Sequence, residues 1–71
     1  MSERVSEREV LIDEIAYCQM ANTKQSTARK QRVTGNGPRF VKIGRSVRYR
    51  IGDVQDWLQS RTVRSTSEEL A

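Results

Sequence analysis

The sequence predicts one small α+β domain: a helix, a second and basic helix, a two-stranded hairpin and a third helix. Three observations support this class. Apolar residues recur at helical spacing near both ends of the chain, apolar and basic residues alternate between positions 39 and 50, and turn-forming residues precede that alternation at 35–38. A chain of 71 residues is long enough for one such domain with a thin core.

Residues 11–22 predict the first helix. Asp13 is a suitable N-cap, because its carboxylate can accept hydrogen bonds from free amides of the first turn, and Ile12 precedes it as a hydrophobic staple. Asn22 can end the helix, since asparagine tolerates a left-handed backbone. Three apolar residues at helical spacing predict a buried stripe: Ile15, Ala16 and Met20.

Residues 23–32 predict a second helix with Thr23 as its N-cap. Ala28 is the clearest inward residue, and the other positions are mostly polar or basic. Because so polar a helix gains little from burial, its surface is expected to make contacts with a partner. Two short helices about three residues apart predict a helix-turn-helix, and an ordinary helical hairpin is the alternative.

The segment from 39 to 50 predicts a β-hairpin. For the apolar residues of both strands to share one face, Ile43 must pair with Val47, and Val41 must pair with Tyr49. This register leaves a three-residue loop at 44–46. Three cations then point away from the core: Lys42, Arg48 and Arg50. Arg45 stands at the tip of the hairpin.

Residues 53–61 predict the third helix. Val54, Trp57 and Leu58 are spaced i, i+3, i+4 and should face the core, with Trp57 as its largest residue. Tyr49 is expected to pack on Trp57 or Val41. The folded domain is predicted at 10–61, between a flexible N-terminus at 1–9 and a flexible tail at 62–71.

The charge is concentrated in the middle of the chain. The whole protein carries a net charge of +4, but residues 22–50 hold nine cations and no acid, while both flanks are net acidic. The cations alternate with apolar residues, so this block is expected to fold and present a basic surface. Such a surface favours a polyanion as partner, and nucleic acid is the usual one.

The composition argues against several classes of protein. Cys18 is the sole cysteine, so neither an internal disulfide nor a four-ligand zinc site is expected. With no histidine to serve as base or metal ligand, we expect neither an enzyme nor a cofactor. The N-terminus lacks the apolar run of a signal peptide, and no segment is apolar enough to cross a membrane. The chain is therefore expected to be cytoplasmic, with neither a membrane nor a small molecule as partner.

The element order is that of a winged helix-turn-helix, with the hairpin as the wing. The run RVTGNGPRFVKIGRSVRYRIGDVQDWLQSR, residues 32–61, resembles the second half of small MerR-like winged-helix proteins. These include excisionases, also called recombination directionality factors, and AlpA-type regulators of phages and integrative elements. The shared pattern is a helix ending in arginine, G-x-G-P, an apolar-basic strand, G-R-x-V-R-Y-R and D-V-x-x-W-L. The match covers about half the chain.

The resemblance implies that the second helix enters the major groove of DNA and that the wing contacts the backbone or the minor groove. The expected DNA-binding residues of the recognition helix are Lys24, Gln25, Ser26, Thr27, Arg29, Lys30 and Arg32. Those of the wing are Arg39, Lys42, Arg45, Ser46 and Arg48. Arginine can contact guanine and glutamine can contact adenine through two hydrogen bonds, so Gln25 and Arg29, with Lys30, are the candidates for base contacts.

The resemblance also implies a role in recombination. An excisionase binds double-stranded DNA near an attachment site, associates with further copies there, bends the DNA and helps an integrase excise a mobile element. An AlpA-like transcriptional regulator is the alternative. RNA binding is a third reading, which the lack of paired exposed aromatic residues on the hairpin disfavours.

Overall fold

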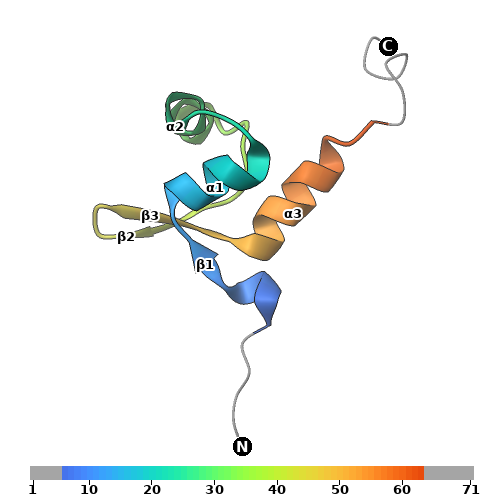
Figure 1. Ribbon diagram of the computed structural model, residues 1–71. Coiled ribbons are helices and arrows are strands. Elements are labelled where there is room, and N and C mark those ends of the chain that lie inside the picture. The colour runs from blue at the N-terminus through green and yellow to red at the C-terminus, as the bar shows by residue number, and fades with distance from the viewer. Residues whose placement is uncertain (1–5, 64–71) are drawn as a thin grey trace, which may run out of the picture.

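The computed structural model describes residues 6–63, which form an α+β domain of three α-helices and a three-stranded antiparallel sheet (Figure 1). The elements in chain order are the 3-10 helix η1 (Glu7–Glu9), β1 (Leu11–Ile12), α1 (Glu14–Ala21), α2 (Gln25–Thr34), β2 (Val41–Ile43), β3 (Ser46–Arg50) and α3 (Ile51–Ser60). The predicted α+β class and the order of the helices and hairpin are confirmed. Residues 1–5 and 64–71, most of the predicted flexible ends, lie outside the described residues.

Helix α1 begins and ends at the predicted residues. The Asp13 side chain accepts a hydrogen bond from the backbone N–H of Ala16 at 2.9 Å, and Asn22 adopts the left-handed conformation with φ of 53°. The predicted apolar stripe is wrong, because Ile15 is 55% exposed and Met20 is 40% exposed. The helix buries Tyr17 and Cys18 instead. An aromatic ring removes more apolar surface from water than the shorter side chains of the stripe do.

Helix α2 follows after three residues, as predicted, but it starts later. Lys24, with extended backbone, occupies the N-cap in place of Thr23, and the helix continues to Thr34. Ala28 is fully buried, as predicted. Gly35 ends the helix with φ of 78°, and its N–H donates to the carbonyl of Gln31 at 2.8 Å.

The sheet has the order β1-β3-β2, and β1 was not predicted as a strand. Leu11 pairs with Arg50, and Ile12 pairs with Tyr49. The predicted hairpin register is wrong by one residue. Val41 pairs with Arg48, Lys42 with Val47, and Ile43 with Ser46, so the loop contains the two residues Gly44 and Arg45.

The chemistry of the turn explains this register. Gly44 has φ of 61° at the first position of the two-residue loop, where type II′ hairpin turns require a glycine. Because opposite residues share a face, Lys42 lies on the same side as Val47, which packs against the core, and Val41 and Ile43 lie on the outer side with Arg48. The prediction that Lys42 points away from the core is therefore wrong, although its side chain remains exposed.

Helix α3 begins at Ile51, two residues before the predicted start, directly after β3. Val54 is fully buried and Leu58 is partly buried against the core. Gly52 lies against η1, where an added Cβ would stand 2.9 Å from the Cβ of Arg8. This close approach lets Arg8 form an ion pair with Asp56 at 2.9 Å, so residues 7–9 of the predicted flexible N-terminus pack on α3.

Two stacked tyrosines form the centre of the core. The rings of Tyr17 from α1 and Tyr49 from β3 lie 4.3 Å apart between centroids, with an angle of 21° between their planes. Both are essentially fully buried, whereas Trp57 is half-buried and contacts Tyr17 edge-on at 6.4 Å. The prediction that Trp57 is the largest core residue is wrong, and the ring on which Tyr49 stacks is that of Tyr17. The core sits between α1 and β3, with Ala28 of α2 and Val54 of α3 completing it.

Candidate nucleic-acid interface

The N-cap Lys24 and the first six residues of α2, 25–30, present a polar surface, and this segment is called the first half of α2 below. Six of the residues expected to bind DNA are exposed here: Lys24, Gln25, Ser26, Thr27, Arg29 and Lys30. They surround Ala28, whose buried methyl group holds this part of the helix against the core. Residues 22–50 contain no acid, so no acidic side chain of this segment offsets the positive charge of the surface.

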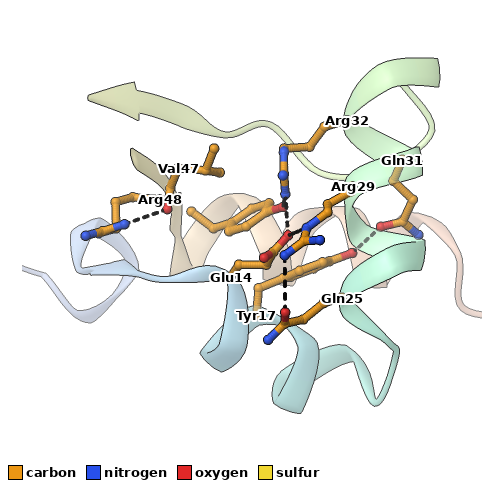
Figure 2. A network of polar contacts seen from close by, with 9 residues as sticks. Glu14, Tyr17, Gln25, Arg29, Gln31, Arg32, Val47 and Arg48 are labelled. Carbon is orange, nitrogen blue, oxygen red and sulfur yellow. Dashed lines mark hydrogen bonds and ion pairs between the residues drawn. The ribbon is translucent and has the colours of Figure 1, made fainter. Parts of the chain in front are cut away.

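Two arginines of α2 converge on one carboxylate of α1 (Figure 2). Arg32 Nη1 donates to Glu14 Oε2 at 3.0 Å, and Arg29 Nε lies 3.4 Å from the same oxygen. The Glu14 side chain is 18% exposed, so it is screened from water far more than a surface acid. Glu14 thus neutralises part of the charge of α2 and links α2 to α1.

Arg32 is held inside the fold. Its Nη1 also donates to Tyr49 Oη at 2.9 Å, its guanidinium lies 5.9 Å from the centroid of the Phe40 ring, and its side chain is 19% exposed. Burial lowers the pKa of Arg32, but the hydrogen bonds to Tyr49 and Glu14 outweigh it and raise the pKa. Arg32, expected to bind DNA, thus has its guanidinium engaged in joining α2 to α1 and to β3.

A second link joins α1 to the end of α2. The hydroxyl of Tyr17 donates to Gln31 Oε1 at 2.7 Å. Burial, followed by the neighbouring Tyr49 and Cys18, raises the pKa of Tyr17, so the hydroxyl keeps its proton near neutral pH. The second half of α2 is therefore fixed by hydrogen bonds to buried groups, while its first half faces solvent.

The hairpin carries most of its predicted contact residues on the surface. Arg45 occupies the two-residue turn and Ser46 begins β3, and both are exposed, as are Lys42 and Arg39. In Figure 1 the turn projects on the side of the molecule away from α3. Arg48 is half-buried, and its Nη1 donates to the carbonyl of Val47 at 2.8 Å, so its guanidinium is less accessible than that of Arg45.

A groove beside Trp57 was not predicted. It has a volume of about 490 Å³ and is lined by Thr27, Lys30, Gln31, Thr34, Asn36, Trp57 and Arg61. Trp57 Nε1 and Arg61 Nη2 both donate to the carbonyl oxygen of Asn36, at 3.2 and 3.1 Å. The Arg61 guanidinium lies 5.4 Å from the centroid of the Trp57 ring. These contacts fasten the end of α3 to the loop after α2 and thus support α2 from its far end.

Sequence reasoning missed Glu14 as a member of this site. An acid in the first turn of a helix is ordinarily read as an exposed partner of the helix dipole. The signal that could have identified it is its position one residue after the N-cap Asp13, on the helix that precedes an acid-free basic block. Among residues 6–63, no group of three or more potential metal ligands is found, and none of the helices is long and apolar enough to cross a membrane.

Neither the models of known protein families nor the curated proteins contain a match to this chain.

Proposed function

We propose that the chain is a winged helix-turn-helix protein that binds double-stranded DNA, with α2 as its recognition helix and the β2–β3 hairpin as its wing. The observation that carries this proposal is the surface of α2. Its first half exposes hydroxyl, amide and cationic groups around a buried Ala28, within a stretch of sequence that has no acid. An α-helix fits the major groove, where such side chains bond phosphates and base edges.

Helix α2 and the hairpin would contact different parts of the DNA. Ser26 and Thr27 lie in the first turn of α2, where free backbone amides and the helix dipole favour a phosphate. Arg29 and Lys30 follow on the exposed surface, within reach of bases or of the opposite backbone. Arg45 at the tip of the wing would enter a narrow minor groove, whose negative potential attracts arginine. Arg39 and Lys42 would neutralise phosphates.

We further propose that the protein acts as an excisionase, an accessory factor that helps an integrase excise a mobile element. The support is the resemblance of residues 32–61 to MerR-like excisionases, together with the small size of the proposed interface. A single module of this kind covers roughly 600–1,000 Å² and gives modest specificity, so several copies side by side on the DNA would be needed. The same resemblance favours an AlpA-like transcriptional regulator as the second candidate. Neither role requires a catalytic group or a cofactor.

DNA binding is tested by measuring the affinity of the whole chain for a duplex over a range of salt concentrations. If about five phosphates are neutralised, log K should fall with log salt at a slope of about −4 to −5. Lys30→Gln and Arg45→Gln should each reduce the steepness of the slope by about one. Arg8→Gln is the matched control, because Arg8 is an exposed cation on η1, remote from α2, and should change the slope little.

A competition experiment completes this test. Duplex RNA of the same sequence should displace the DNA poorly, because the deep, narrow major groove of A-form RNA does not admit side chains from a helix. Equal competition by RNA, or equal effects of Lys30→Gln and Arg8→Gln, would contradict DNA binding through α2.

The two roles are separated by selecting binding sites from a random duplex library. Short repeats in tandem, bound cooperatively and with a bend in the DNA, support the excisionase. An isolated or palindromic site, bound without cooperativity, favours the transcriptional regulator.

A further inference from the structure

We propose that Arg29 reads a single guanine through the outer edge of its guanidinium, and that Glu14 and Gln25 are the positioning residues that hold its inner edge. This inference rests on the proposed function, because it assumes that α2 enters the major groove. It goes further in naming the base, the edge of the arginine that contacts it, and two residues that act on specificity without touching DNA.

Two contacts within the protein involve neighbouring nitrogens of the Arg29 guanidinium (Figure 2). Nε lies 3.4 Å from Glu14 Oε2, and Nη2 donates to Gln25 Oε1 at 3.4 Å. In a planar guanidinium, the Nε hydrogen and one Nη2 hydrogen lie along one side, and both contacts to the protein involve the nitrogens of that side. The second Nη2 hydrogen and a hydrogen of Nη1 point forward from the end of the side chain. The side chain is 63% exposed, and the contacts to Glu14 and Gln25 involve Nε and Nη2, which leaves Nη1 accessible to a partner.

Two parallel N–H donors match guanine better than any other base in the major groove. Guanine presents two adjacent acceptors, O6 and N7, whereas adenine presents one acceptor beside a donor, and this pairing makes the arginine–guanine contact the commonest specific one. A lysine matches guanine less well, since an ammonium group acts as a point charge without the planar fork.

Glu14 is itself immobilised, which is why it can position Arg29. Its Oε2 accepts from Arg32 Nη1 at 3.0 Å, and Arg32 in turn donates to Tyr49 Oη at 2.9 Å on β3. Glu14 and Arg32 are both about four-fifths screened from solvent. The carboxylate therefore cannot follow a swinging Arg29. Holding the arginine before DNA arrives reduces the side-chain entropy that binding would otherwise cost.

This arrangement argues against the expected contact of Gln25 with an adenine. Reading an adenine requires both the oxygen and the amide nitrogen of a glutamine. In the structure the Gln25 oxygen accepts from Arg29 one helical turn later, so the oxygen is committed within the protein. Gln25 thus increases the preference of Arg29 for guanine by holding its side chain in place, and Gln25 itself contacts no base.

The test is a selection from a random duplex library with the whole chain, comparing the wild type with Arg29→Lys, Gln25→Ala and Arg39→Lys. Arg29→Lys should reduce the preference for guanine at one position by about tenfold or more and leave the other positions unchanged. Gln25→Ala should weaken the preference at that same position. Arg39→Lys is the matched control at an exposed arginine assigned to phosphate, and it should leave every base preference in place.

A second variant tests the carboxylate. Glu14→Gln keeps an oxygen acceptor and removes the charge, and its folding is checked by thermal unfolding because Arg32 shares this partner. It should lower the guanine preference at the Arg29 position while its affinity for random-sequence DNA stays equal or increases, since an acid has been removed. A merely structural role would weaken binding to all sequences alike.

The possible failures are distinguishable. If the wild type enriches no sequence, the proposed function fails and the inference fails with it. If the wild type enriches a motif that Arg29→Lys leaves unchanged, the inference alone is wrong. If Gln25→Ala removes a preference at a different position from Arg29→Lys, Gln25 reads its own base and its assignment as a positioning residue is overturned.

Discussion

The two halves of helix α2 differ in what their side chains do, although both are polar and basic in sequence. Arg29 in the first half is 63% exposed, and Arg32 in the second half is 19% exposed, yet both contact the same oxygen of Glu14. Residues three positions apart lie close together on a helix, separated by somewhat less than one turn. This small difference in direction places the Arg32 side chain against α1 and β3 and leaves the Arg29 side chain largely in solvent. The second half of the helix is fixed to α1 and β3 through Arg32, whereas the side chains of the first half remain largely exposed.

The largest expected loss of stability comes from removing the contacts of Arg32, which fix the second half of α2. Arg32→Ala leaves Glu14 and Tyr49 Oη without their shared partner in a screened site, and should reduce the free energy of unfolding by about 2–3 kcal/mol. For a domain this small, that is a large fraction of its stability. Urea unfolding measures the loss.

The matched comparison is Arg29→Ala, which removes the same charge from the exposed half. Its effect on the free energy of unfolding should stay within about 0.5 kcal/mol. Equal losses for the two variants would contradict the division of α2 into a fixed and an exposed half.

A smaller effect is expected from the second link of the fixed half. Tyr17→Phe removes the hydroxyl that donates to Gln31 Oε1 but keeps the stacked ring, so the stability should fall by about 1 kcal/mol. Tyr17→Leu, which also removes the stacking on Tyr49, should cost more, and a loss no greater than that of Tyr17→Phe would argue against the tyrosine pair as the centre of the core.

Alkaline pH should loosen the same region. Burial raises the pKa of Cys18 above its ordinary 9.0 and, with neighbouring groups, the pKa of Tyr17 above its ordinary 10.0. A group whose pKa is raised on folding binds its proton more tightly in the folded chain. The contribution of these two groups to the free energy of unfolding should thus be fully present below about pH 8 and be lost as the pH rises further.

Urea unfolding between about pH 8 and about pH 11 measures this fall, and Cys18→Ala should move its onset toward the pKa of tyrosine. A free energy of unfolding that rises across this range would contradict the burial of the two groups.

The smallest effect on stability is expected from replacing Arg45 at the hairpin tip. Arg45→Ala removes an exposed side chain and should change the free energy of unfolding by less than about 0.5 kcal/mol. Gly44→Ala forces a side chain into positive φ and should cost about 1 kcal/mol, so this pair separates the shape of the turn from its charge. Thermal unfolding of both variants checks the difference, and equal midpoints would argue against the type II′ turn.

Local signals predicted much of the fold. The caps Asp13 and Asn22, the buried Ala28 and Val54, and the tip residue Arg45 all follow from short-range chemistry and lie where the sequence indicates. The hairpin register differs from the predicted one because Gly44, with its positive φ, favours a two-residue turn, whereas hydrophobic alternation favours a three-residue loop. A glycine at the first loop position is the sequence signal of a type II′ two-residue turn.

Contacts between distant elements could not be predicted in this way. Three such contacts join residues at least 15 positions apart: the stacking of Tyr17 on Tyr49, the hydrogen bond from Arg32 to Tyr49, and the ion pairs of Glu14 with two arginines. In the sequence Arg29 and Arg32 are two equal positive charges. The packing of α2 against α1 and β3 leaves the first side chain exposed and screens the second from solvent. The exposed surface of the candidate interface followed from the sequence, whereas the network that fixes it did not.

The measurement that tests the central claim most directly is a titration of the ¹⁵N-labelled chain with a DNA duplex, followed by amide chemical shifts. Binding through α2 and the hairpin predicts that the largest changes cluster at residues 24–30 and 44–46. Smaller changes are expected at Glu14 and Arg32, and little change at η1 and α3. Largest changes at η1 and α3, or no changes at near-physiological salt, would contradict an interface formed by the first half of α2.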